Sequence, residues 1–197
     1  VRTTQYFGHQ PGDECAKGFE SALHLAGKQV VIQAKRLNLP ALEVYGDGIA
    51  PRVHKPLRTK VVERATSAAY QAVEAEASLE VSESLPATSL QADLFSAAPV
   101  APETHFLRAD LKASHAGGID WIEIRVTHAV DARKRNLMQH AGLRVIEIDL
   151  SGLFRPGITL DEVRRAVVED IENKVWVAHP SVPDAAAALR REWERES

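Results

Sequence analysis

The spacing of apolar residues divides the chain into predicted helices, strands and loops. Residues 1–16 are polar and predict a loop or a short extension. From 17 to 37, apolar side chains recur every three or four positions, which predicts an amphipathic helix that Pro40 ends. Residues 41–45 predict a short strand, and the Gly-Asp-Gly sequence after it predicts a tight turn.

The composition changes in the middle of the chain. Residues 51–64 are basic, and we expect them to pair with the sheet. From about 65 to 103 the chain is mainly Ala, Ser, Glu, Pro and Thr, with few large apolar side chains. Its first part, 65–79, predicts an exposed helix. Residues 80–103 predict a linker or variable insertion, because such a composition buries little apolar surface.

Ordered elements return after residue 104. Residues 106–111 and 120–127 predict two strands, and the turn at 114–118 between them predicts a β-hairpin. Residues 143–150 predict a third strand, which is strongly apolar and therefore expected to be buried on both faces.

Capping residues delimit the later helices. Asp131 can cap a helix over 132–141, with Gly142 in the usual C-terminal position. Because this helix connects two strands, it predicts a right-handed crossover between parallel strands. Thr159 and Glu162 form a capping box for a helix that reaches about residue 173. The predicted buried stripe of that helix is Val163, Ala166, Val167 and Ile171.

This order of elements predicts one α/β domain over residues 1–180, with a mixed sheet flanked by helices. The insertion at about 65–103 interrupts the domain. Residues 181–197 contain many Ala, Arg and Glu residues and predict a helical tail. The tail is a candidate contact for a second copy of the chain or for another protein partner.

The composition is that of an ordinary globular protein. Of the 197 residues, 45% are hydrophobic and 26% are charged. No apolar run approaches the roughly 20 residues of a membrane span, and the first residues lack a signal-peptide pattern. The single cysteine, Cys15, excludes a disulfide within the chain and a thiolate-rich zinc site. We therefore expect a cytoplasmic protein without a membrane partner.

Charge gives a local signal rather than a global one. The net charge of −3 provides no overall attraction to nucleic acid. Two basic runs are candidate nucleic-acid contacts, and each is also consistent with a solvated face. The runs are Arg52, His54, Lys55, Arg58 and Lys60, and Arg133, Lys134 and Arg135.

Carboxylates in the predicted hairpin suggest a metal site. Alternation along a strand places Glu123 and Arg125 on one face, and tight pairing brings Asp110 close to Glu123. Two carboxylates and the carbonyl of Ile124 would form an oxygen-rich site for Mg²⁺ or Mn²⁺. Such an ion polarises a phosphodiester and activates water, and a nearby cation stabilises the developing charge. The alternative is a surface hairpin with an ordinary Glu–Arg pair.

The first helix adds polar residues on one face. Glu20, His24 and Lys28 recur at every fourth position, so they share that face. They either deliver an acid, a proton-active imidazole and a cation to the sheet, or form a solvated stripe. Thr127 and His128, at the end of the second hairpin strand, are candidates for phosphate contacts. For His128 the alternative is a hydrogen bond that ties the strand end to the next helix.

Four segments, taken in order, carry a further pattern. They are ESALHLAGK at 20–28, IEIRVTH at 122–128 followed by Lys134, VIEIDLS at 145–151 and WVAHP at 176–180. Together they resemble the CoiA-like competence nucleases and related bacterial proteins, which more often have Asn at the position of His179. The resemblance covers roughly residues 9–54 and 104–180. It implies a PD-(D/E)XK, restriction-endonuclease-like fold and a metal-dependent DNA nuclease.

The resemblance also implies roles for individual residues. Glu20 is similar to the acidic residue of the family's first helix, Asp110 to the motif Asp and Glu123 to the (D/E). Arg125 stands where the family prefers Lys, or Gln in some members. Because arginine is not a general base at neutral pH, it would stabilise charge only, or Lys28 or Lys134 would do the work of the lysine.

These observations favour a metal-dependent nuclease that acts on DNA rather than RNA. Its metal ligands would be Asp110, Glu123, the Ile124 carbonyl and Glu20. Its substrate contacts would be His24, Thr127, His128, Lys55 and Arg58. The alternative is an inactive module of the same fold that binds nucleic acid or a protein. Glu147 and Asp149, in the third strand, would support the site from outside or pair with basic residues.

Overall fold

The computed structural model describes residues 13–46, 48–50, 59–83 and 103–196. Its central element is a mixed five-stranded sheet, in which β8 and β9 are parallel and all other neighbours are antiparallel. The strand order is β10 (Lys174–Ala178), β9 (Arg144–Asp149), β8 (Gly118–Arg125), β7 (Glu103–His115) and β6 (Ala72–Glu83).

The predicted β-hairpin and crossover are both present. β7 and β8 form the antiparallel hairpin, and α2 (Ala132–His140) connects β8 to the parallel strand β9. The Asp131 side chain accepts a hydrogen bond from the Lys134 amide at 2.9 Å, as expected of a helix cap. Gly142 has a φ of 62°, the left-handed conformation that ends many helices. The buried strand expected at 143–150 is β9.

The first helix, α1 (Asp13–Ala34), differs from its predicted bounds at both ends. It begins inside the segment expected to be a loop. It ends before Lys35, whose φ of 48° is incompatible with a continuing right-handed helix. Residues up to Leu37 were expected to be helical, and this is wrong because Arg36–Leu39 form strand β1. β1 pairs with β5 (Thr66–Ala69), and Leu37 and Leu39 of β1 are buried in the main core.

The exposed helix predicted at 65–79 is also wrong. This segment contains β5 and most of β6, which pairs along its length with β7. Within β6, apolar residues occupy the odd positions from Val73 to Val81, and the even positions carry Glu or Ser. A period of two is typical of a strand, although the small side chains concealed it. Residues 84–102 lie outside the described part of the chain.

The capping box of α3 (Leu160–Val168) is confirmed, but the helix ends earlier than residue 173. The chain then enters β10, which the pattern did not predict. Lys174 at the start of β10 is fully buried, and its ammonium donates to the carbonyls of Ala166 and Asp170. These bonds satisfy carbonyl groups at the end of the helix, which explains how the lysine is accommodated.

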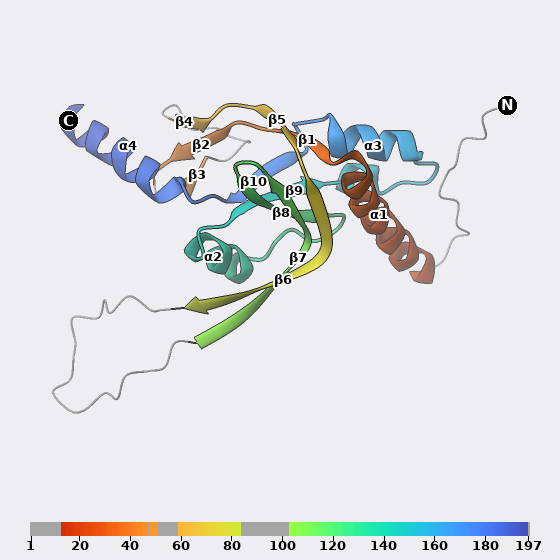
Figure 1. Cartoon of the computed structure of the whole chain (residues 1–197). Helices are drawn as coiled ribbons and strands as arrows, with labels where there is room; N and C mark the ends of the chain where they lie inside the picture. Colours follow the sequence, from red (N-terminus) through yellow and green to blue (C-terminus); the bar gives the residue numbers. More distant parts are fainter. Residues whose placement is uncertain (1–12, 47, 51–58, 84–102, 197) are drawn as a thin grey trace.

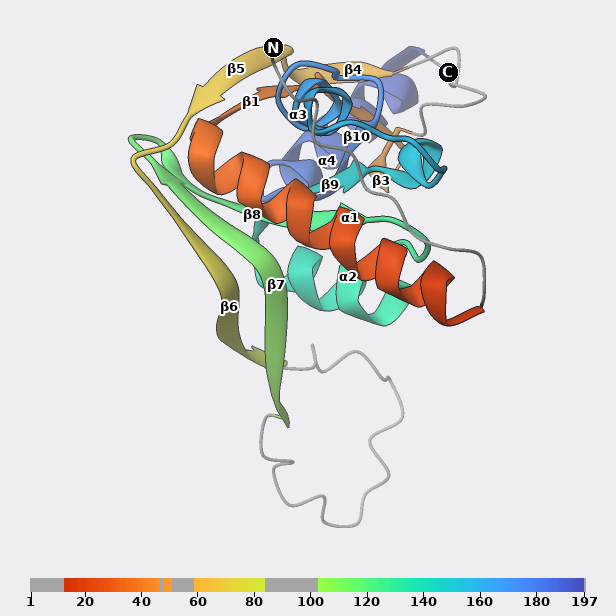
Figure 2. The same ribbon diagram turned by 90° about the vertical axis from the view of Figure 1, so that its right-hand side faces the viewer.

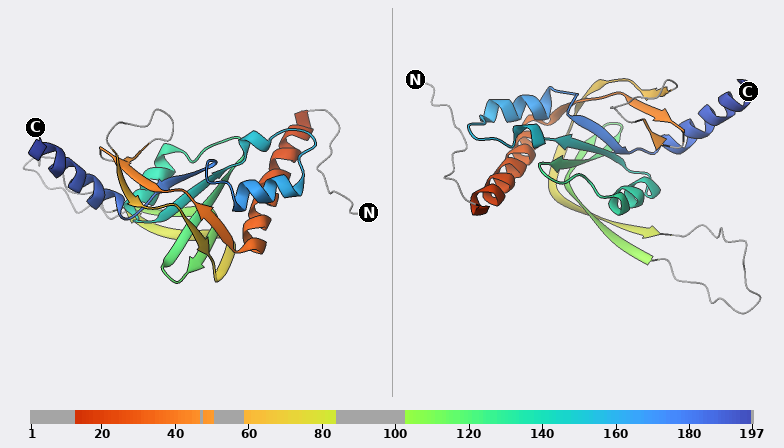
Figure 3. Two further views of the ribbon diagram at one scale, coloured as in Figure 1. Left: turned by 90° about the horizontal axis from the view of Figure 1, so that it is seen from above. Right: turned by 180° about the vertical axis from the view of Figure 1, so that it is seen from behind.

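The C-terminal helix α4 (Val182–Glu196) packs within the chain. It covers a three-stranded sheet of β3 (Gly48–Ile49), β2 (Leu42–Tyr45) and β4 (Lys60–Glu63), in that order. The Tyr45 and Trp193 rings lie 5.9 Å apart, and Lys60 pairs with Glu192 at 2.7 Å. Figure 3 shows α4 at the opposite end of the molecule from α1.

Two apolar layers cover the central sheet. One face packs on α1 and α3 through Ile122, Ile124, Ile146 and Ile148. The other face packs on α2 through residues such as Trp121 and Val145. α1 and α2 therefore lie on opposite sides of the sheet (Figures 1 and 2). Among the described residues, no helix combines the length and apolarity needed to cross a membrane.

Candidate active site

The pairing of β6 with β7 is interrupted where Glu76 lies opposite Asp110. Glu76 has a φ of 53°, which is uncommon for a residue with a side chain. Ala109 packs in the α2 layer, whereas Leu111 packs in the α1 layer. Residues two apart in a regular strand share a face, so β7 bends from one layer to the other at Asp110.

The bend directs the Asp110 carboxylate toward β8 and α1. Its Oδ2 atom accepts hydrogen bonds from the Ile124 amide at 2.8 Å and from His24 Nε2 at 3.0 Å. Lys28 Nζ lies 3.7 Å from Oδ1. Burial raises the pKa of Asp110, but the bonds from His24 and the Ile124 amide, with the charges of His24 and Lys28, outweigh burial and hold the pKa below its ordinary value.

The polar face predicted for the first helix lines a cavity of about 410 Å³. Glu20, His24 and Lys28 form its wall on α1. Opposite them lie four residues at and just after the end of β8: Ile124, Val126, Thr127 and His128. Most of the candidate residues predicted on these two segments therefore meet at one surface.

Thr127 connects the two walls of this cavity. Its hydroxyl donates to the Glu20 carboxylate and lies 2.7 Å from His128 Nδ1. Since the hydroxyl proton is directed to Glu20, the imidazole must donate through Nδ1 to the Thr127 oxygen. Glu20 is thus held by Thr127. The hydrogen bond of His128 is to its neighbour Thr127, and no bond from His128 to α2 is present among the described residues, so the predicted bond from the strand end to the next helix is not observed.

Glu76 is a member of the site that the sequence pattern did not reveal. Its carboxylate accepts from Lys28 and, at 2.9 Å, from Arg108 Nε. The hydrogen bond from Lys28, followed by the charges of Lys28 and Arg108, lowers the pKa of Glu76. The period-two pattern of β6 would have placed Glu76 on a polar strand face. Only the bend brings that face to α1.

Glu123 lies on the α2 side of the sheet. It is 8% exposed and forms an ion pair with Lys134 of α2 at 2.8 Å. Burial raises the pKa of Glu123 to about 7, and the negative charges of Asp110 and Glu147 act in the same direction, although Lys134 opposes them. The charge of Asp110 thus reaches Glu123, but Asp110 contacts α1 whereas Glu123 contacts α2, so the two carboxylates do not share the one face that strand alternation was expected to give them.

Arg125 is directed toward the neighbouring strand β9. Its Nη1 atom lies 3.3 Å from Asp149 Oδ2 and 3.9 Å from Glu147 Oε1. Glu147 also accepts from the Val130 amide at 2.8 Å. Of the two alternatives for Glu147 and Asp149, pairing with a basic residue is the one observed. The charge of Arg125 is thereby largely neutralised within the sheet.

Within its described residues, the structure does not place the remaining predicted site residues in a metal-binding or substrate-binding arrangement. Lys55 and Arg58 fall outside the described residues. Ile124 uses its amide to bind Asp110, and a ligand role for its carbonyl stays a prediction. In the described parts of the chain, no group of three or more His, Cys, Asp or Glu side chains is arranged to hold a metal ion.

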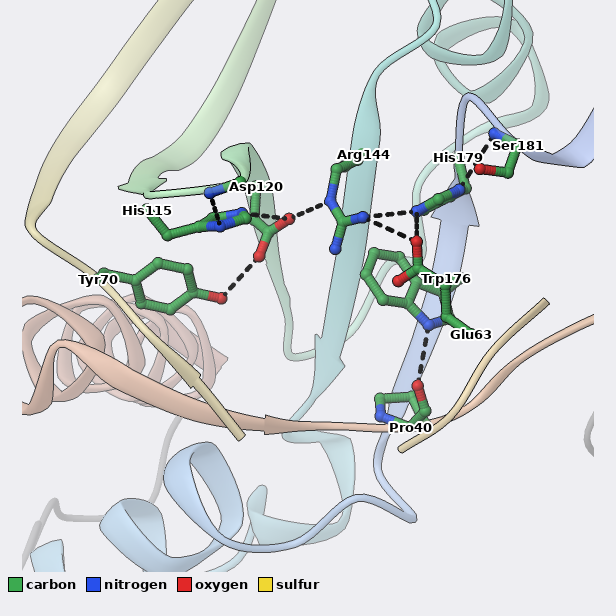
Figure 4. Close-up of polar contacts among 10 residues, drawn as sticks. Pro40, Glu63, Tyr70, His115, Asp120, Arg144, Trp176, His179 and Ser181 are labelled. Carbon is green, nitrogen blue, oxygen red and sulfur yellow. Dashed lines mark hydrogen bonds and ion pairs between the residues drawn. The ribbon is translucent and has the colours of Figure 1, made fainter. Parts of the chain in front are cut away.

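A second polar cluster lies at the other end of β8 and was not predicted (Figure 4). Asp120 is 1% exposed and accepts from Tyr70 at 3.0 Å and from Arg144 Nε at 2.7 Å. Burial, followed by the charge of Asp120 and the hydrogen bond to it, raises the pKa of Tyr70. Arg144 continues to Glu63 at 3.0 Å. These partners lie 24 to 81 residues apart, so no local pattern indicates them.

His179 completes this second cluster, and its contacts define a tautomer. Nδ1 accepts from the Ser181 amide at 3.2 Å, so the proton of the neutral ring is on Nε2. Nε2 lies 3.0 Å from Glu63 Oε1 and donates to it, so Arg144 Nη1, which is also 2.9 Å from Nε2, donates to Glu63 and not to the ring. Burial lowers the pKa of His179, the charge of Arg144 acts in the same direction, and both outweigh the opposing charge of Glu63. The neutral ring packs edge-on against Trp176, with centroids 5.1 Å apart.

Comparison of the chain with protein-family models, with curated proteins and with solved structures gave no match.

Proposed function

We propose that the chain is a metal-dependent nuclease with a restriction-endonuclease-like core, acting on DNA rather than RNA. The observation that carries the proposal is the position of Asp110 at the bend of β7. There it meets His24 and Lys28 from α1 and the backbone of β8 next to Glu123. Acid and cation from separate segments thus converge beside a cavity, as phosphodiester hydrolysis requires.

The residues near this position include oxygen donors of the type that a divalent cation binds, although the described residues contain no group of three or more such side chains already arranged around one point. Asp110 and Glu123 supply carboxylate oxygens, the ligands that Mg²⁺ and Mn²⁺ prefer. Glu123 is a buried carboxyl whose pKa is raised to about 7, so a nearby positive charge would stabilise its ionised form. Asp110 and Glu123 would hold the ion, with Glu20 and the Ile124 carbonyl as further oxygen donors. When bound, the ion would polarise the phosphodiester and activate water.

Lys28 is the better candidate for the missing lysine of the resembled motif. It lines the cavity and lies 3.7 Å from Asp110, whereas Arg125 is paired with Asp149. In this proposal Lys28 stabilises the charge that develops on the phosphate. Lys134 pairs with Glu123 and maintains its position.

A cleavage assay on single-stranded, double-stranded and branched DNA, and on RNA, tests the proposal. We expect cleavage that needs Mg²⁺ or Mn²⁺ and stops in EDTA. Asp110→Ala and Glu123→Ala should each reduce the rate at least about 100-fold. Glu194→Ala, which removes an exposed carboxylate of α4, is the control and should cleave normally. Full metal-dependent cleavage by the Asp110 and Glu123 variants would show that the site is elsewhere.

The second candidate is an inactive module that binds nucleic acid or a protein. The pairing of Arg125 with β9 favours it, because that residue then contributes little charge to the site. Thermal unfolding with and without Mn²⁺ separates the candidates. A working site at 100-fold excess over Kd would be stabilised by about 2.7 kcal/mol, and the stabilisation would be lost in Glu123→Ala. No stabilisation together with no cleavage would favour the module.

A further inference from the structure

The outer face of β7 continues away from the candidate site as an exposed surface. Residues 106, 108 and 110 share one face, because alternate residues of a strand point the same way. The residues between them, Leu107 and Ala109, are buried against the α2 layer. Figure 2 shows the β6–β7 pair extending past α1. The face that carries Asp110 therefore leads outward along this ribbon.

Two side chains on this face have an unusual combination of exposure and chemistry. Phe106 is 76% exposed, more than any other large apolar residue described, and the Arg108 side chain is 69% exposed. Arg108 binds Glu76, the same carboxylate that binds Lys28. Contacts through Glu76 and Lys28 thus join the cavity to Arg108. Phe106 lies two residues further along β7 on the same face, and at about 3.3 Å per residue its Cα is roughly 13 Å from that of Asp110.

We propose that this face binds an unpaired strand of nucleic acid, with a base stacked on Phe106 and a phosphate bound by Arg108. The inference rests on the proposed function and names its substrate class. An exposed aromatic ring stacks on any base. Arg108 is paired with Glu76 through Nε and Nη2, but its exposed guanidinium has further N–H groups that can donate to the phosphate backbone. The ribbon then guides the strand toward Asp110 and the cavity.

The surroundings favour a base over a phosphate at Phe106. Glu80 of β6 lies directly across from Phe106 in the strand register, and its carboxylate repels a phosphate placed there. Bases in a duplex are already stacked on each other, so their faces are closed to the ring. Single-stranded DNA and RNA share the required chemistry, and the binding test includes both.

The test measures binding of short labelled strands by fluorescence anisotropy in EDTA, where cleavage is stopped. The variants are Phe106→Ala, Phe106→Trp and Val61→Ala. Val61 is the matched control, since it is 54% exposed on a strand of another sheet. Phe106→Ala should raise the Kd for single-stranded DNA or RNA roughly 5- to 150-fold. Phe106→Trp should bind like the parent, and so should Val61→Ala.

Probe and stability controls make the outcome specific. For a strand with abasic positions, the parent and Phe106→Ala should have the same Kd. The same should hold for a full duplex. Melting temperatures should agree within about 2 °C, because the ring is solvent-exposed. The inference is overturned if the parent binds no single strand, or if Phe106→Ala binds single strands as tightly as the parent. It is also overturned if Phe106→Ala lowers the affinity for abasic strands as much as for normal ones, or if the variant melts well below the parent.

Binding and cleavage also fail independently. Phe106-dependent binding without cleavage in Mg²⁺ or Mn²⁺ would reject the nuclease and keep the stacking surface, in a binding module. Cleavage with normal binding by Phe106→Ala would keep the nuclease and reject the surface.

Discussion

Asp110 and Glu123 belong to the two strands of one hairpin but have opposite electrostatic environments. Asp110 accepts two hydrogen bonds, and these hold its pKa below the ordinary value despite burial. Glu123 has a single cationic partner and a deeper position, so burial raises its pKa to about 7. Environment, rather than residue type, therefore separates the two carboxyls, and neutral pH leaves Asp110 ionised while Glu123 titrates.

The raised pKa of Glu123 predicts a pH-dependent stability. The carboxyl has a pKa of about 7 in the folded chain and roughly 4.3 when unfolded, so the folded state holds more protons between these values. The contribution of Glu123 to the free energy of unfolding is fully present below the pKa of the unfolded chain, and it is lost as the pH rises toward 7. Glu123→Gln removes this loss. Relative to the parent, it should gain roughly 1–3 kcal/mol of unfolding free energy between pH 4.5 and 8.

Urea unfolding at several pH values, with EDTA present, measures this gain. Glu194→Gln, on the exposed side of α4, should follow the parent at every pH. A constant difference between Glu123→Gln and the parent from pH 4.5 to 8 would contradict the assigned environment.

At the scale of elements, the approach of α1 to the sheet positions the cavity. A Cβ atom added at Gly27 would lie 2.9 Å from Leu150 Cδ1 and 3.1 Å from Ile124 Cγ2. Such distances are shorter than normal carbon contacts, so only glycine permits this spacing between helix and strand. Gly27 precedes Lys28 and follows the turn that carries His24. Its close contact therefore determines how near these side chains come to Asp110.

Two glycines of α1 provide a matched prediction. Gly27→Ala gains about 1 kcal/mol in helix propensity but overpacks against Ile124 and Leu150, so we expect a net loss of about 1–2 kcal/mol. Gly18→Ala, with no atom within 4 Å of the added Cβ, should instead gain up to about 1 kcal/mol. Thermal unfolding of both variants measures the difference. Equal effects would show that α1 does not pack as closely as described.

At the scale of the whole molecule, the cluster around Asp120 joins the three sheets. Asp120 in the central sheet binds Tyr70, which follows β5, and Arg144 extends from β9 to Glu63 of β4. Trp176 of β10 donates to the Pro40 carbonyl at 3.0 Å, between β1 and β2. The small sheets are therefore held to the central sheet by polar contacts as well as by apolar packing.

Breaking this cluster should destabilise the protein as a whole. Asp120→Ala leaves the Arg144 charge and the Tyr70 hydroxyl without their buried partner, so we expect a loss of about 3–5 kcal/mol. Tyr70→Phe removes one hydrogen bond and should cost about 1–2 kcal/mol. Glu192→Ala, which breaks an exposed pair with Lys60, should have little effect. Chemical denaturation gives all three values. Similar stabilities for Asp120→Ala and the parent would exclude a structural function for the cluster.

Local patterns alone determined a definite part of this protein. The Asp131 cap, the Thr159–Glu162 capping box and the β7–β8 hairpin are confirmed because each depends on residues close together in sequence. The shared face of Glu20, His24 and Lys28 follows from helical spacing, and all three line the cavity.

Long-range contacts decided the rest. β6 is a strand because pairing with β7 stabilises small side chains that have no strong preference of their own. Glu76 reaches Lys28 only because β7 bends at Asp110. Arg144, which binds Asp120, also binds Glu63 of β4, and these two residues are 81 positions apart in the chain. Sequence spacing determines which residues share a face of one element. The packing of elements decides which faces meet, because that depends on contacts between residues far apart in the chain.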